Sequence, residues 1–215
     1  MRNTQFAEGE FYHLVGRGNS KQILFLEKRD YVRFLYLLLY GQLSEPLSNI
    51  GKRVTCFEKT GAFFSRRRKN DLAQEKHLIE LVAFTIMPNH FHLLVGGKSE
   101  NGISAYMHRL LMAYAKYFNE KYERSGHVFQ GPFRAVHIED NTQLLHTSAY
   151  IHKNQREVGK WKNKEHEYPW SSYQDYVKGS RWEELLSRDI ILEQFSSVGE
   201  YANFVKSSIA KEASP

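Results

Sequence analysis

The feature of this sequence that most constrains its fold is a pair of apolar segments near the middle of the chain. Residues 78–87 and 90–95 are dense in Ile, Leu, Val, Phe and Thr, and only Pro88 and Asn89 separate them. Apolar and β-branched residues favour strands, whereas Pro and Asn are common in turns. The pattern predicts two strands joined by a tight turn.

The segments around this hairpin alternate between strand and helix patterns, judged by the period at which apolar side chains recur. In chain order, the other expected elements are a strand over 11–17, a helix over 28–40, a helix over 101–122, a strand over 133–138 and a helix over 141–154 with Asp140 or Asn141 as its N-cap. This order predicts an α+β fold: a ferredoxin-like antiparallel sheet (split βαβ, similar to RNA-recognition sheets) with helices on one face, plus a C-terminal helical tail.

The chain has 215 residues, which is enough for one substantial core and short for two. We therefore expect one domain over residues 1–176 and a helical extension over 177–215. Within the domain, Pro46, Gly51 and Gly61 break the periodicity, so an irregular, exposed insertion is expected at about 41–77. It contains a basic run at 66–69, which is either a solvated loop or an arm that contacts phosphates.

The charge balance suits a polyanionic partner. Lys and Arg number 30 against 24 Asp and Glu, a formal net charge of +6, although ordinary surface charge also explains such an excess. The one cysteine, Cys56, allows no internal disulfide, which fits a reducing cytoplasm. No secretory signal is apparent, and the longest apolar run, 34–40, is far shorter than the roughly 20 residues that cross a bilayer. A soluble, cytoplasmic protein without a membrane partner is expected.

Two histidines begin the second strand of the predicted hairpin. Because side chains alternate faces along a strand, His90 and His92 point the same way with Cα atoms about 7 Å apart, and Phe91 points to the opposite face. Histidine is a frequent ligand of divalent metals, so the pair is a candidate metal site. A chance pair is the alternative, since the chain has 10 histidines.

A tyrosine and an asparagine share one face of the last predicted helix, because Tyr150 and Asn154 are four residues apart. A phenol has a pKa near 10 and is a poor nucleophile at neutral pH, so phosphoryl transfer by Tyr150 requires a nearby cation. A core tyrosine is the alternative interpretation. Spacing alone leaves four rival nucleophiles open: Tyr106, Tyr114, Tyr117 and Tyr122.

Five segments together carry a resemblance to a known family. The segment MPNHFHLLV at 87–95 resembles the HUH strand of the IS200-like Y1 transposases, especially the branch of REP-associated tyrosine transposases. In the family's order, the other four are Tyr12-His13 through Arg17-Gly18-Asn19, GHVFQG at 126–131, Tyr150-Ile151-His152 through Asn154, and YPWSSY at 168–173. The resemblance spans roughly residues 11–176.

The resemblance implies a small nuclease that cuts single-stranded DNA beside a hairpin and becomes joined to the 5′ phosphate through one tyrosine. It implies that His90 and His92 bind the metal, that Tyr150 is the nucleophile and that Asn154 completes the metal shell. Mg²⁺ or Mn²⁺ is the implied cofactor, although two imidazoles would also accept Zn²⁺ or Ni²⁺. The function expected is therefore metal-dependent single-strand cleavage and strand transfer at hairpin DNA, as in transposition.

The sequence departs from the family pattern in two places. Asn154-Gln155 stands where Asn-Pro is usual, and Gly131-Pro132-Phe133-Arg134 stands where Gly-Arg-Phe is common. The second departure relocates a cation, and Arg134 is the candidate substitute. The residues expected to contact nucleic acid are Arg17, Asn19, Arg66, Arg67, Arg68, Arg134, Lys153 and Arg156.

Two other functions remain open at this stage. One is a binding module for structured single-stranded nucleic acid without catalysis. The other is a metal phosphodiesterase in which water attacks the phosphate instead of tyrosine. A monomer is expected in preference to a dimer that exchanges helices, because a long segment follows the last helix and can hold it in cis.

Overall fold

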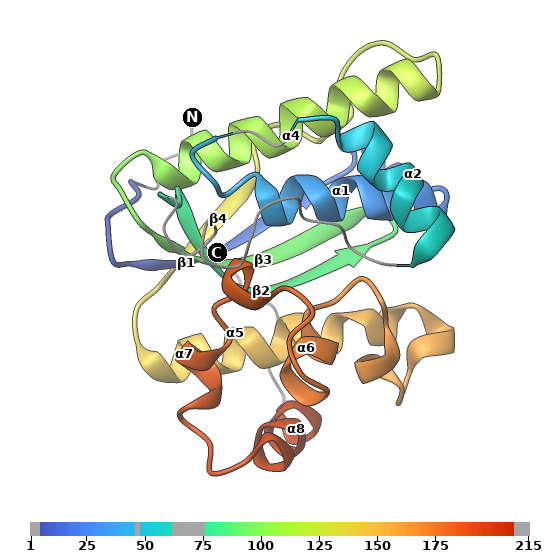
Figure 1. The fold of residues 1–215 in the computed structure, drawn as a ribbon. Helices are drawn as coiled ribbons and strands as arrows, with labels where there is room; N and C mark the ends of the chain where they lie inside the picture. The colour runs from blue at the N-terminus through green and yellow to red at the C-terminus, as the bar shows by residue number, and fades with distance from the viewer. Residues whose placement is uncertain (1–4, 46–47, 62–75, 209–215) are drawn as a thin grey trace.

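Four strands form one antiparallel sheet in the order β2-β3-β1-β4 (Figure 1). The computed structural model describes residues 5–45, 48–61 and 76–208. The strands are β1 (Phe11–Arg17), β2 (Ile79–Met87), β3 (His90–Gly97) and β4 (Arg134–Ile138). All three pairings are antiparallel, and the β2–β3 turn closes at the Met87–His90 pair. The predicted α+β fold, its ferredoxin-like sheet and the central hairpin are confirmed.

Helices cover both faces of this sheet. Figure 1 shows α1 (Lys28–Tyr40) and α4 (Gly102–Lys121) above the sheet and α5 (Asn141–Lys153) below it. The prediction of helices on one face therefore holds for α1 and α4 and is wrong for α5. The physical reason lies in β3, which is buried at every position, so that both of its faces need a cover.

The remaining helices are short and follow α1 or α5 in the chain. Those with α-helical geometry are α2 (Ile50–Thr60), α6 (Tyr173–Val177), α7 (Asp189–Leu192) and α8 (Val198–Ser207). The 3-10 turns are η1 (Asn19–Lys21), η2 (Asn154–Glu157), η3 (Gly159–Trp161), η4 (Glu165–Glu167) and η5 (Glu183–Leu185). Within the described ranges, no helix is both long and apolar enough to cross a membrane.

The segment expected to be an irregular, exposed insertion contains a helix instead. In α2, Ile50, Val54 and Phe57 form an apolar face that packs onto the core, with Val54 fully buried. Three apolar residues at intervals of four and three suffice for one face of a short helix, a signal that the flanking Pro and Gly residues obscured. Gly61, at φ 70°, ends the helix in the left-handed conformation that glycine adopts without strain. The basic residues Arg66, Arg67 and Arg68 lie outside the described residues.

The C-terminal helices hold α5 in place. Asp140 caps its N-terminus by accepting a hydrogen bond from the Gln143 backbone N–H at 2.7 Å, which confirms one of the two predicted caps. Further along, the buried His152 bonds the Tyr201 hydroxyl of α8 at 2.6 Å and the Ser172 hydroxyl at 2.8 Å. The two bonds tie α5 to α8 and to the segment that flanks β2.

A buried carboxylate joins α1 to α4 on the opposite side of the sheet. Asp30 is inaccessible to solvent, and burial by itself would raise its pKa, but hydrogen bonds from Lys121, Tyr122 and Tyr117 together hold the pKa below its ordinary value. These bonds measure 2.5, 2.7 and 2.9 Å. The backbone N–H groups of Leu26 and Glu27 complete the shell.

Replacing Asp30 by alanine is expected to destabilise the protein by about 3 kcal/mol, which is the lower end of the range for removing one partner of a buried ion pair. The lower end is expected because Lys121 keeps Glu27 as a partner. The folded-state pKa is depressed, so this contribution is present at neutral pH and is lost as pH falls through that pKa. Urea unfolding of the wild-type and variant proteins at pH 7 and at stepwise lower pH measures both effects. As a control, Asp189→Ala removes a carboxylate that is 76% exposed and is expected to cost under about 1 kcal/mol.

Candidate active site

The histidine pair lies in a row of polar side chains on the sheet face that α5 covers. In the β1–β3 register, Arg17 is opposite His90 and Val15 is opposite His92. Residues directly opposite in antiparallel strands share a face, and His13 shares it too because it is two residues from Val15. The ring centroids of His90 and His92 are 5.0 Å apart, and those of His13 and His92 are 5.1 Å apart.

The other face of the same strands is apolar. Phe91 points toward α1 and contacts Phe34, with ring centroids 4.9 Å apart. Opposite Phe91 stands Gly16, where a Cβ atom would lie 2.3 Å from the Phe91 ring. Gly16 therefore leaves room for the Phe91 ring. Phe91 points to the face opposite the two histidines, as the alternation of side chains along the strand predicted.

Hydrogen bonds orient both imidazoles. His90 Nδ1 lies 2.7 Å from Asn89 Oδ1, an acceptor, so Nδ1 carries the proton and Nε2 keeps its lone pair. His92 Nδ1 is bonded to His13 Nε2 at 2.9 Å, which leaves His92 Nε2 for a ligand. Partners of this kind fix ring orientation and tautomer in metal-binding histidines.

All three histidines are held in the neutral form. Burial, with Arg134 nearby, lowers the pKa of His13 to about 4. Burial and the charge of Arg17 lower the pKa of His90 to about 4, against an opposing effect of Asn154. Burial, followed by the neighbouring histidines, brings the pKa of His92 well below its ordinary value. Neutral imidazole is the form that binds metals, so the rings can act as ligands at neutral pH.

Tyr150 and Asn154 approach the histidines from α5. The Tyr150 ring meets His92 and His13 edge-on, at centroid distances of 5.4 and 5.8 Å. Asn154 Nδ2 donates to the Tyr150 hydroxyl at 3.3 Å, which confirms that the two residues share a helix face. Among the described residues, no group forms a hydrogen bond of regular geometry with the buried Asn154 Oδ1, although Asn154 lies close enough to His90 to raise the pKa of that ring. A buried oxygen in this state is costly unless a ligand satisfies it.

These side chains line a pocket of about 380 Å³. Arg17 and Arg134 supply positive charge from β1 and β4, and Glu157 supplies a carboxylate from η2. The polar side chains of the pocket are two imidazoles, two amides, a phenol, a carboxylate and two guanidinium groups, a set that suits a phosphate oxygen bound beside a cation.

The donor set fits a divalent metal ion. His90, His92 and Asn154 line the same pocket, and neutral imidazole nitrogens and amide oxygens serve as ligands of first-row divalent metals. Across the described residues, no group of three or more His, Cys, Asp and Glu side chains is arranged to hold a metal. The candidate set therefore depends on the Asn154 amide.

The other residues expected to contact nucleic acid are spread out. Asn19 is exposed, and its backbone N–H binds the Val128 carbonyl. Lys153 donates to the carbonyls of Lys206 and Ser208, and Arg156 pairs with Glu165. Lys153 and Arg156 line a neighbouring hollow, which shares Asn154 with the pocket that holds the histidines.

The rival tyrosines lie on α4 or at its C-cap, across the sheet from the histidines. Tyr106 and Tyr114 are fully buried and donate to the backbone carbonyls of Leu38 and Leu24. Tyr117 and Tyr122 bond to Asp30, as described above. Among these tyrosines and Tyr150, only Tyr150 shares a pocket with the histidine pair.

Sequence analysis missed two members of the site, His13 and Glu157. His13 lies four residues before Arg17 on an alternating strand, so a shared face was visible in the sequence. Its contact with His92 depends on the β1–β3 register, which no local pattern specifies. Glu157 is in η2, beyond the predicted end of the last helix.

Comparisons with known proteins agree with this architecture. Residues 52–154 match the family model described as "Transposase IS200 like". The matched segment carries the histidine pair, Tyr150 and Asn154, and the match confirms the resemblance predicted from the sequence.

The chain is also similar to a solved structure, "Structure of the REP associates tyrosine transposase bound to a REP hairpin", with a TM-score of 0.53 and 16% sequence identity. The similarity covers 83% of this chain and 84% of that chain. At this identity it concerns the fold. A search of curated proteins finds no match.

Proposed function

We propose that this protein is a metal-dependent single-stranded DNA endonuclease and strand transferase that acts beside DNA hairpins, with Tyr150 as its nucleophile. The observation that carries the proposal is the convergence of Tyr150, His90, His92 and Asn154 in one pocket. Two further findings support it: the family match over 52–154, and the structural neighbour, a REP-associated tyrosine transposase bound to a REP hairpin.

In the proposed reaction, the Tyr150 oxygen attacks the scissile phosphorus in line with the leaving 3′ oxygen. The new bond is a phosphotyrosine ester to the 5′ phosphate, and the bond that breaks releases a 3′-OH, which takes up a proton as the phenol loses one. The ester conserves the energy of the phosphodiester. A second 3′-OH then reverses the step at a new junction, so strand joining requires no nucleotide cofactor.

The chain's own residues would hold and orient the reacting groups. His90 Nε2, His92 Nε2 and Asn154 Oδ1 would bind the cation, proposed as Mg²⁺ or Mn²⁺, which when bound withdraws charge from the phosphate. The Asn154 amide N–H keeps the Tyr150 hydroxyl in the pocket. Arg17 and Arg134 would contact non-bridging phosphate oxygens.

We further propose that one chain acts as a monomer, with its own α5 in its own site. The support comes from the bonds of His152 to Tyr201 and Ser172, all three of which are buried. A nuclease unit over 1–176 would then be completed by the extension 177–215, because Tyr201 of that extension packs against α5.

Incubation with end-labelled hairpin DNA and Mn²⁺ tests the proposal. A covalent protein–DNA product is expected on a denaturing gel, it should disappear in EDTA, and peptide mapping should locate it at Tyr150. Metal-dependent cleavage without an adduct would point to water as the nucleophile. Tight hairpin binding with no cleavage would point to a binding module.

A further inference from the structure

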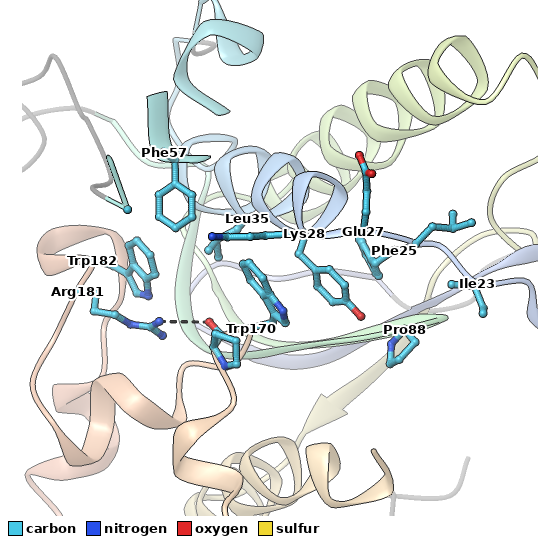
Figure 2. Close-up of a pocket in the computed structure, with 14 residues that line it drawn as sticks. Ile23, Phe25, Glu27, Lys28, Leu35, Phe57, Pro88, Trp170, Arg181 and Trp182 are labelled. Atoms are coloured by element: carbon cyan, nitrogen blue, oxygen red, sulfur yellow. Dashed lines mark hydrogen bonds between the residues drawn. The ribbon is translucent and has the colours of Figure 1, made fainter. Parts of the chain in front are cut away.

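A second pocket, larger than the candidate active site, lies beyond the edge of the sheet at β2. Its volume is about 1050 Å³, and Figure 2 shows it between the start of α1, the end of α2 and the chain around Trp170 and Trp182. Most of its lining is apolar or aromatic, including Phe25, Tyr31, Phe57, Trp170 and Trp182. The proposed reaction uses none of these residues.

One wall of the pocket is a flat aromatic platform. Trp170 stacks on Tyr31, with ring centroids 4.8 Å apart and planes inclined by 17°. Among the described residues, no other aromatic ring stacks on Trp170, and its indole projects into the middle of the pocket (Figure 2). Its backbone carbonyl accepts from Ile86 of β2 at 2.9 Å, so the platform is anchored to the sheet before any ligand arrives.

The rim of the pocket is apolar and unusually exposed. Ile23 and Leu26 are 54% and 57% exposed, and they are two of the four large hydrophobic side chains with such exposure in the described part of the chain. Both line this pocket. Exposed apolar groups gathered beside a cavity mark a binding surface more often than scattered single ones do.

The charge of the pocket favours an anionic ligand. The Lys28 side chain lies across it, and no carboxylate of the described residues pairs with Lys28 (Figure 2). The carboxylate of Glu27 is bound by Lys121 at 2.5 Å and points away from the pocket (Figure 2). Arg181 is held by Asp175 and by the Pro169 carbonyl. The Lys28 ammonium group lies over the Phe57 ring, 5.7 Å from its centroid, and is the cation of this pocket without a carboxylate partner among the described residues.

The β2–β3 turn connects this pocket to the candidate active site. Pro88 lines the aromatic pocket, and His90, two residues later, lines the site that holds Tyr150. Lys21, which is exposed, accepts a hydrogen bond from the Asn89 side chain through its carbonyl and so lies at the same turn. The two pockets therefore lie on either side of one tight turn.

We propose that the aromatic pocket binds unpaired nucleobases of the DNA strand next to the scissile phosphate, with Trp170 as the stacking surface and Lys28 at the sugar-phosphate backbone. The inference rests on the proposed function. Only unpaired bases expose both faces for insertion, so the pocket selects hairpins that carry a single-stranded tail. Each base stacked on an aromatic ring typically strengthens binding by roughly tenfold or more.

Three labelled hairpins test this inference: one without a tail, one with a 5′ tail and one with a 3′ tail of about six unpaired nucleotides. Binding is measured in EDTA, so that no strand is cut. Leu26→Glu and Ile23→Glu place a negative charge on exposed rim positions without disturbing the core. Each is expected to weaken binding of the hairpin whose tail enters the pocket about tenfold. Affinity for the hairpin without a tail should not change. Val198→Glu, a change of the same kind at a 44% exposed position on α8, is the matched control.

Photo-crosslinking identifies the contact directly. Tails that carry 5-iodouracil are expected to crosslink to Trp170 or its neighbours in the pocket. Two results would overturn the pocket assignment and leave the proposed function standing. One is crosslinks confined to the candidate active site, and the other is wild-type affinity of both rim variants for both tailed hairpins. A wild-type protein that binds none of the three hairpins would contradict both.

Discussion

Replacing Tyr150 by phenylalanine is expected to abolish the covalent protein–DNA product and to slow hairpin cleavage by at least about 10⁴-fold, the scale of loss when a catalytic nucleophile is removed. The substitution deletes one oxygen and keeps the ring, so the contacts with His92 and His13 and the position of α5 should persist. Single-turnover cleavage of a labelled hairpin, followed on a denaturing gel, measures the loss, and thermal unfolding checks the fold.

The rival tyrosines provide the controls for this experiment. Tyr117→Phe and Tyr122→Phe each remove one hydrogen bond to Asp30 on the opposite side of the sheet. Each is expected to lower stability by about 1 kcal/mol and to leave adduct formation intact. A Tyr150→Phe protein that still forms an adduct, or that cleaves at the wild-type rate, would remove Tyr150 from the mechanism.

Replacing His92 by alanine is expected to reduce both Mn²⁺ affinity and the cleavage rate by more than about 100-fold. Losing a residue that only hydrogen-bonds to a metal ligand usually costs about 10–100-fold, and losing a ligand itself should cost more. His92 lines the pocket with Nδ1 bound to His13, and the neighbouring Asn154 oxygen forms no regular hydrogen bond with the described residues. Calorimetric titration with Mn²⁺ and cleavage assays across Mn²⁺ concentrations separate metal affinity from chemistry.

The effects of His92→Ala on Mn²⁺ affinity and cleavage are compared with those of His13→Gln. His13 touches His92 through Nε2 and is expected to orient it without binding metal itself. Its removal should therefore cost about 10–100-fold in Mn²⁺ affinity, and excess Mn²⁺ should restore cleavage. Equal and unrecoverable losses in the two variants would argue that His13 is itself a ligand. Wild-type metal affinity in His92→Ala would exclude the proposed metal site.

Much of the fold could be predicted because its signals are local. The period of apolar residues located α1, α4 and the β2–β3 hairpin within a residue or two, and Asp140 was predicted as one of two possible caps. The helix α2 escaped prediction because its apolar face has only three residues between segments rich in Pro and Gly. For the site, alternation along β3 and helical spacing along α5 correctly grouped His90 with His92, and Tyr150 with Asn154.

What the sequence by itself determined about this protein is therefore which side chains share a face of one element, because strand pleat and helix pitch follow from the geometry of the backbone. Tertiary structure alone decided how the elements meet. The register that brings His13 to His92, the placement of α5 across the sheet from Tyr114, and the packing of Trp170 on Tyr31 each depend on partners distant in sequence. Such contacts are selected by burial of the whole core, and no local period encodes them.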